Sequence, residues 1–179
     1  MLPVEILISE HRLILHTVGI LKKGQQQIVA SSKIDPNFVV ASVDFFRTYA
    51  DRYHHGKEEG ILFNELYKRK LSEADGAMMR ELILEHATAR RTVTTLEIMK
   101  DNYIIGKTDS SNGILEALNV LIELYPRHIE KEDKHFFHPS MTYFTEKEQN
   151  KMLRQFQEFN QTFTDNRYKL AIENLEKGL

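Results

Sequence analysis

Apolar residues recur along most of the chain at the three- and four-residue spacing of a helix that buries one face. Four such faces follow one another, from Val4 to Leu21, Val43 to Ile61, Met79 to Leu96 and Leu118 to Phe136. No stretch shows the strict alternation of apolar and polar residues that is typical of a half-buried strand. The pattern therefore predicts an all-α protein.

Breaks rich in glycine, serine or proline separate these faces, at residues 31–36, 72–76 and 106–113. In the first break, Asp35-Pro36 offers a helix N-cap followed by proline at the first helical position. The breaks predict long helices over about 4–30, 36–70, 77–105 and 114–137, and a polar fifth helix over about 146–175.

Four long helices joined by short connections predict an up-down-up-down four-helix bundle. We expect the bundle to occupy residues 1–145. Residues 146–179 are expected to form an additional C-terminal helix that packs on the bundle or extends it.

Three residues disturb this helical pattern. Gly56 and Gly60 lie inside the second predicted helix, where each costs about 1 kcal/mol relative to alanine. Pro126 lies inside the fourth and predicts a kink one turn before His128, because proline cannot donate the helical hydrogen bond. Since these three residues lie beside histidines, they indicate that the helices are shaped around a group bound between them.

Composition narrows the function. The chain has 179 residues, of which 41% are hydrophobic and 28% charged, which suits one well-buried domain. Its formal net charge of −2 lacks the basic excess of a nucleic-acid-binding protein, so we expect no nucleic-acid partner. The chain has no cysteine, which excludes thiolate metal sites and leaves nitrogen and oxygen as metal ligands.

The first residues do not resemble a targeting segment. They lack the charged n-region of a signal peptide, and Glu5, Glu10 and His11 interrupt their apolar stretch. We therefore expect a cytoplasmic protein with no membrane partner.

The placement of the histidines carries the chemistry. His11 and His86 fall on the apolar faces of the first and third predicted helices. Two His–Glu pairs continue the apolar faces of the second and fourth helices, and their i, i+4 spacing puts both members of a pair on one face. A single histidine of this kind is more often a hydrogen-bonded core residue, and a single pair is more often a surface ion pair.

Six inward polar groups from four helices are different, because burying two carboxylates without compensation costs several kcal/mol each. A bound cation removes that cost. The residues that we predict to be metal ligands are His11, His54, Glu58, His86, His128 and Glu132.

An internal duplication supports this prediction. Residues 8–11 resemble 83–86, with the histidines 75 positions apart, and residues 54–63 resemble 128–137, 74 positions apart. The repeat predicts a symmetric two-metal centre in which each ion takes two histidines and both carboxylates bridge. Nitrogen and carboxylate ligands suit iron, manganese or zinc.

Glu132 and His135 also match the Glu-x-x-His spacing of ferritin-like di-iron bundles. Those bundles need the motif twice, and the position equivalent to His135 is the apolar Ile61. We therefore interpret His135 as a packing residue or an outer contact of the site.

The ordered motifs Glu-His-Arg, His-His-Gly-Lys-Glu-Glu, Glu-His and His-Ile-Glu-Lys-Glu-Asp resemble the hemerythrin-like, or HHE cation-binding, family over about residues 4–145. The resemblance implies a non-haem di-iron centre, with two iron ions held by the six ligands, that binds dioxygen or a related small oxidant. Zinc and manganese remain alternatives.

One position departs from the oxygen-carrying members of that family, which place another histidine four residues after the equivalent of His86. This chain has Arg90 there. Four histidines leave an open position, which permits reaction as well as reversible binding. We interpret Arg90 as reaching solvent or pairing with an acid; the alternative is that it stabilises a bound anion.

Other candidates have smaller roles. Tyr125 is expected to pack in the core, with a contact to a metal-bound oxygen or to iron as the alternative. Tyr53, His16, His55 and His138 are expected to be exposed or peripheral. The remaining acids beside the ligands are expected to accept hydrogen bonds from histidine N–H groups or to be solvated: Glu10, Glu59, Glu85 and Asp133.

Three functional classes use such a ligand set. The first is a di-iron protein that binds or senses dioxygen or a related small oxidant. The alternative is a di-iron redox enzyme or iron-centre repair protein that handles peroxide or nitric oxide. The third is a structural bundle holding zinc or another divalent ion. The polar fifth helix could also support a homodimer.

Overall fold

The computed structural model describes residues 1–177, and these contain helices and no strand. Residues 178–179, the end of the predicted C-terminal helix, lie outside the described residues. The first long stretch is α1 Val4–Ser31, and the second consists of α2 Pro36–Phe45, the π-helices η1 Phe46–His55 and η2 Glu58–Phe63, and α3 Asn64–Leu66. The third is α4 Glu73–Ile104, and the fourth consists of α5 Ser110–Lys131, the π-helix η3 Glu132–Phe136, α6 Phe137–Ser140 and the 3₁₀-helix η4 Met141–Tyr143. The helices α7 Glu146–Thr162 and α8 Arg167–Lys177 follow.

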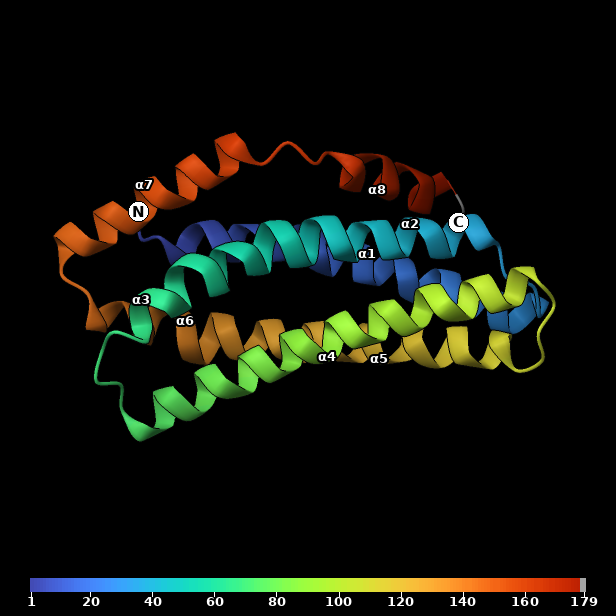
Figure 1. The fold of residues 1–179 in the computed structure, drawn as a ribbon, viewed down its shortest axis with the longest axis horizontal. Helices are drawn as coiled ribbons and strands as arrows, with labels where there is room; N and C mark the ends of the chain where they lie inside the picture. Colours follow the sequence, from blue (N-terminus) through green and yellow to red (C-terminus); the bar gives the residue numbers. More distant parts are fainter. Residues whose placement is uncertain (178–179) are drawn as a thin grey trace.

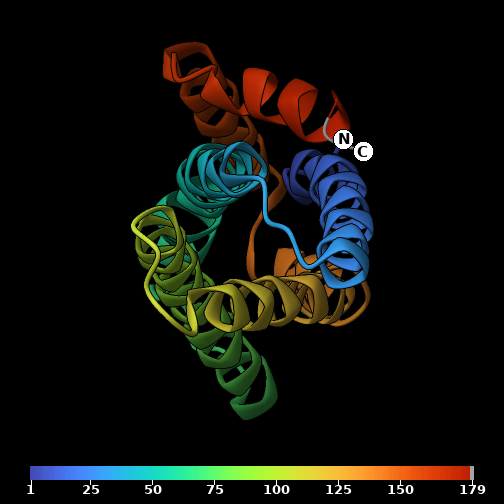
Figure 2. The ribbon, with the colours of Figure 1, turned by 90° about the vertical axis from the view of Figure 1, so that its right-hand side faces the viewer.

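Four long stretches run side by side along the molecule (Figure 1) and surround a common centre when viewed end-on (Figure 2). The stretch that starts with α2 contacts α4, α4 contacts α5, and α5 contacts α1. Consecutive stretches run in opposite directions, because each connection between them is short. The predicted all-α four-helix bundle is confirmed.

Local capping explains where the helices begin. The Asp35 carboxylate accepts the N–H of Asn37 at 2.9 Å, as predicted for the second helix. The Ser72 hydroxyl accepts the N–H of Asp75, so α4 begins at Glu73 rather than at 77. α5 begins at Ser110, four residues earlier than predicted.

Pro126 does not interrupt α5, which continues to Lys131. The change from α-helical to π-helical hydrogen bonding comes later, at Glu132. The same change occurs in the second stretch over η1 and η2. Segments of π-helix within α-helices often mark functional sites, and here they carry His54, Glu58 and Glu132 of the predicted metal site.

The C-terminal segment is two helices where the sequence predicted one. α7 begins with a capping box formed by Thr145 and Glu148, and the backbone becomes extended at Phe163. α8 then packs on α2 and α1, along the side of the bundle where α7 also lies (Figure 1).

The hydrophobic core of the described residues has two clusters. One contains Val4, Leu7 and Phe63, and the other contains Ile14 and Phe46 among its members. The buried ionisable side chains lie between the clusters along the bundle axis, as His11 follows Leu7 and precedes Ile14 in α1. The fold therefore encloses a polar layer between two apolar layers.

Among residues 1–177, no helix combines the length and the apolar character needed to cross a membrane. The cytoplasmic location stays a prediction.

Candidate metal centre

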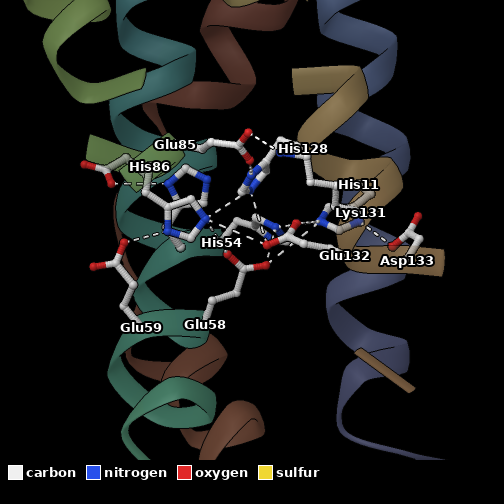
Figure 3. A network of polar contacts seen from close by, with 12 residues as sticks. His11, His54, Glu58, Glu59, Glu85, His86, His128, Lys131, Glu132 and Asp133 are labelled. Carbon is white, nitrogen blue, oxygen red and sulfur yellow. Dashed lines mark hydrogen bonds and ion pairs between the residues drawn. The ribbon is translucent and has the colours of Figure 1, made fainter. Parts of the chain in front are cut away.

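All six predicted ligands meet in the polar layer (Figure 3). They come from four stretches of the bundle, and each has a relative exposure of 2% or less. They are His11 in α1, His54 in η1, Glu58 in η2, His86 in α4, His128 in α5 and Glu132 in η3.

The histidines form two pairs. The Nε2 atoms of His11 and His54 are 2.9 Å apart, and those of His86 and His128 are 3.0 Å apart. Each pair combines two stretches of the bundle, and the pairs correspond to each other through the sequence repeat.

The two glutamates connect the histidine pairs. One oxygen of Glu58 is 3.0 Å from Nε2 of His54, and its other oxygen is 3.3 Å from Nε2 of His86. Glu132 does the same, at 3.3 Å from His11 and 3.2 Å from His128. Each carboxylate therefore directs one oxygen toward each pair, as a bridging ligand does.

The outward nitrogen of every ring faces a carboxylate, with Nδ1–O distances of 2.7 to 2.9 Å (Figure 3). An ionised carboxylate only accepts, so each Nδ1 carries the proton and donates it. The four pairs are His11 with Asp133, His54 with Glu10, His86 with Glu59 and His128 with Glu85. The prediction that these acids accept histidine N–H groups is confirmed.

This arrangement fits a metal. In a neutral ring whose Nδ1 carries the proton, Nε2 presents a lone pair, so each close Nε2–Nε2 contact needs a cation or a further proton. The four carboxylate oxygens of Glu58 and Glu132 are buried and have no hydrogen-bond partner among residues 1–177. Two donor groups of the described residues could each hold an ion, namely His11, His54, Glu58 and Glu132, and His55, Glu58, His86 and His128.

Burial and the carboxylates act oppositely on the rings. Burial disfavours a charged imidazole, but the hydrogen bond to Asp133 and the charges of Glu132 and Glu58 outweigh it and raise the pKa of His11 to about 9. The carboxylate of Glu132 similarly raises the pKa of His128 to about 10 against the effect of burial. A metal ion that binds here must displace protons from these rings.

The repeat extends beyond the ligands. The Lys57 ammonium pairs with Glu10, and that of Lys131, 74 positions later, pairs with Glu85. The ring of Phe63 stacks on His86, and that of Phe137 stacks on His11. The centre therefore has nearly two-fold symmetric surroundings.

His55 breaks this symmetry, and its predicted peripheral position is wrong. It has a relative exposure of 1% and stacks on His86. A π-helix takes more residues per turn than an α-helix, so faces assigned with an α-helical period shift along η1. The adjacent histidine pair His54-His55, opposite His128-Ile129 in the repeat, was the available sequence signal.

The other peripheral candidates behave differently. His16 and His138 are exposed, as predicted. Tyr53 is half-buried, and the ammonium of Lys57 lies over its ring. His135 is exposed, so the packing alternative for this residue is wrong. Its alternative role as an outer contact of the site stays a prediction.

Arg90 pairs with two acids. Its Nε donates to Asp51 at 2.6 Å and its terminal nitrogen donates to Glu59 at 2.7 Å. The acid-pairing interpretation is confirmed. Tyr125 is buried and stacks on Phe46 with ring centroids 4.9 Å apart, which is core packing as predicted.

A cavity of about 220 Å³ lies beside the His86 half of the centre. Its lining includes Asp51, His55, Arg90 and Tyr125. Sequence reasoning missed it, because its walls come from three stretches of the bundle.

Comparison with sequence models of protein families matched residues 2–138 to the Hemerythrin HHE cation binding domain. Neither the curated proteins nor the solved structures gave a match. The family match covers most of the chain and all six predicted ligands, and the buried histidines and glutamates fit a metal site. The chain therefore belongs to the hemerythrin HHE cation-binding family.

Proposed function

We propose that this chain binds two iron ions at His11, His54, Glu58, His86, His128 and Glu132, and that the resulting non-haem centre binds or senses dioxygen or a related small oxidant. The observation that carries the proposal is the placement of the two glutamates, each with one oxygen toward either histidine pair. Membership of a cation-binding family supports it. Imidazole and carboxylate ligands suit iron, manganese and zinc alike. Iron is proposed among them because the resemblance to the hemerythrin-like family implies it, and zinc and manganese are the alternatives.

Bound iron would supply Lewis acidity and one-electron chemistry. The chain supplies the geometry. Four outer carboxylates hold the imidazole rings with Nε2 directed inward, which fixes the donor positions before an ion arrives. The apolar clusters on both sides bury the six side chains, and burial strengthens the electrostatic interactions between them.

The alternative is a redox enzyme or an iron-centre repair protein that handles peroxide or nitric oxide. Arg90 favours it, because a centre with only four histidines keeps more positions open for reaction. Both functions need the same two ions.

Metal stoichiometry tests the shared part. Protein reconstituted with ferrous iron without oxygen should contain two irons per chain by metal analysis. Glu58→Ala and Glu132→Ala should reduce this to one or fewer, because each removes a ligand of both ions. His16→Ala and His138→Ala are the matched controls, since both side chains are exposed and outside the polar layer. One iron or none in folded wild-type protein would contradict the two-iron centre.

Optical spectra separate binding from reaction. The reduced iron protein is exposed to oxygen, and the gas is then removed over repeated cycles. Return of the reduced spectrum in each cycle supports reversible binding or sensing. An oxidised spectrum that persists after the gas is removed, together with turnover of peroxide or nitric oxide, supports the enzyme instead.

A further inference from the structure

The cavity of about 220 Å³ beside the His86 half of the centre has none of the six predicted ligands in its lining. Its lining residues that reach solvent are all polar, whereas its buried ones are mostly apolar or aromatic. These buried residues are Phe46 and His55 of η1, Ala89 and Val93 of α4, and Tyr125 of α5. The cavity therefore has an apolar interior and a polar rim.

The hydroxyl of Tyr125 lacks a partner at this cavity. The residue is 1% exposed, and its ring is held by stacking on Phe46. Its hydroxyl makes no hydrogen bond to any of residues 1–177. Burial raises the pKa of Tyr125, so the hydroxyl keeps its proton and remains a hydrogen-bond donor. Because buried hydroxyls normally have partners, we expect a group in the cavity to accept this hydrogen bond.

His55 lies in the same wall and is also incompletely paired. Its Nδ1 is buried and has no hydrogen-bond partner among the described residues. An oxygen of Asp51 lies 3.5 Å away, but this oxygen already accepts a hydrogen bond from Nε of Arg90 at 2.6 Å. Two polar side chains of one buried wall therefore lack partners, which indicates that the cavity is built to hold a polar group.

The charges at the rim favour a neutral ligand. Arg47 makes two hydrogen bonds to Glu97, at 2.9 and 2.7 Å. Arg90 is held by Asp51 at 2.6 Å and by Glu59 at 2.7 Å. Both guanidinium groups are thus already neutralised, and the carboxylate of Asp51 itself lines the cavity. An anionic ligand would lose its hydration here without gaining an unpaired cation.

The size of the cavity favours a single aromatic ring. An apolar cavity of about 150 Å³ is large enough to bind benzene, so about 220 Å³ leaves room for a ring with one substituent. Water would fill the same space with about seven molecules, and each needs at least two polar partners that an apolar interior does not offer. The space exists because Ala89 is small. Its equivalent in the repeat is the buried Ile14, 75 positions earlier.

We propose that this cavity is a binding site for a small neutral phenol, whose ring packs against Phe46 and Val93 and whose oxygen accepts the hydrogen bond of Tyr125. The site needs no bound ion. It shares a wall with the metal centre, because His55 lines the cavity and stacks on His86 with ring centroids 3.8 Å apart.

Nuclear magnetic resonance titration of the ¹⁵N-labelled, metal-free chain tests the site. Phenol should bind with one-to-one stoichiometry and shift the backbone amide signals of Ala89, Arg90 and Val93. Toluene has the same ring without the hydroxyl and should bind about 3- to 10-fold more weakly, the effect of one hydrogen bond between neutral groups. Benzoate, which is charged, should also bind more weakly than phenol.

Conservative variants locate the hydrogen bond. Tyr125→Phe should lower the affinity for phenol to that for toluene and leave the affinity for toluene unchanged. Tyr49→Phe is the matched control, because Tyr49 is also buried but does not line the cavity. Ala89→Ile places the equivalent residue of the other half in the cavity and should abolish the binding of both compounds. If Ala89→Ile does not fold, Ala89→Val tests the same effect.

The outcomes separate this proposal from the two-iron centre. The phenol site is overturned if phenol does not bind, if toluene or benzoate binds as tightly, or if Tyr125→Phe keeps the wild-type affinity for phenol. Since the titration uses metal-free protein, none of these results bears on the iron stoichiometry. A folded chain that binds phenol as expected but fewer than two irons overturns only the two-iron proposal.

Discussion

At the scale of single residues, the same polar contact occurs twice with different burial. Glu10 accepts the His54 N–H and pairs with Lys57, whose side chain is fully buried. Lys57 also lies 3.5 Å from the centre of the Tyr53 ring. In the other half, Glu85 makes the equivalent contacts to His128 and Lys131, but its side chain is 24% exposed. The repeat therefore offers an internal comparison of one interaction in two environments.

Removing these acids should have unequal effects. Glu10→Ala leaves the ammonium of Lys57 buried without its carboxylate, which costs about 3–5 kcal/mol when a buried pair is broken. Glu85→Ala exposes a partner that water can reach, and the expected loss is about 1 kcal/mol. Urea denaturation of the metal-free variants measures both losses in the free energy of unfolding.

Metal titration of the same variants gives a second measurement. Each loses the acceptor of one ligand histidine, so about a 10–100-fold lower affinity is expected for the ion beside it. Equal stability losses for Glu10→Ala and Glu85→Ala would show that burial does not distinguish the two pairs.

At the scale of the elements, α7 explains why one half is more buried. Asn160 of α7 accepts a hydrogen bond from Lys57 at 2.9 Å. Phe156 of α7 is buried in the cluster that contains Val4 and Phe63. A Cβ on Gly56 would lie 3.2 Å from the ring of Phe159, so the glycine allows α7 to approach the second stretch closely. α7 thus covers the Lys57 side of the metal centre.

The start of α7 should respond to acid. A hydrogen bond from the Thr145 N–H and the guanidinium of Arg69 lower the pKa of Glu148 to about 2. A lowered pKa stabilises the fold above the unfolded-state value near 4.5, and this contribution is lost as the pH falls from there toward 2.

Glu148→Gln should therefore lower the unfolding midpoint at pH 7 and flatten its decline between pH 5 and 3, by about the contribution of one helix cap. Thermal unfolding followed by circular dichroism across this range measures both effects. Glu158→Gln changes an exposed glutamate of the same helix and is the control. The cap assignment would be wrong if both variants kept the wild-type pH dependence.

At the scale of the whole molecule, the polar layer separates the two apolar clusters and joins all four long stretches. The histidine pairs connect α1 to η1 and α4 to α5, and the glutamates connect these pairs to each other. Ions bound there would hold together elements far apart in sequence. Metal binding and global stability should therefore be coupled.

Thermal unfolding with and without metal tests the coupling. Free metal at 100 times its dissociation constant adds about 2.7 kcal/mol per site to the free energy of unfolding. The wild-type midpoint should rise accordingly, and a chelator should reverse the rise. Glu58→Ala should show little increase, whereas His16→Ala should match wild type. A wild-type midpoint that is independent of metal would contradict this coupling.

The sequence by itself determined the helical architecture and the positions of the six central side chains. Apolar periodicity, helix caps and i, i+4 spacing are local properties, so His54 and Glu58 could be placed on one face without knowing what packs against it. The repeat then related the two halves of the chain. These residues do meet in the fold, and their binding of metal stays a prediction.

Only the tertiary structure decided how the two halves differ. The burial of His55 depends on π-helical turns and on the ring of His86 from another helix. The pairing of Arg90 with Asp51 and Glu59 joins α4 to the second stretch, and α7 covers Lys57 while Lys131 stays partly exposed. Such contacts join residues distant in sequence, and neither periodicity nor spacing along one helix encodes which helix packs against which.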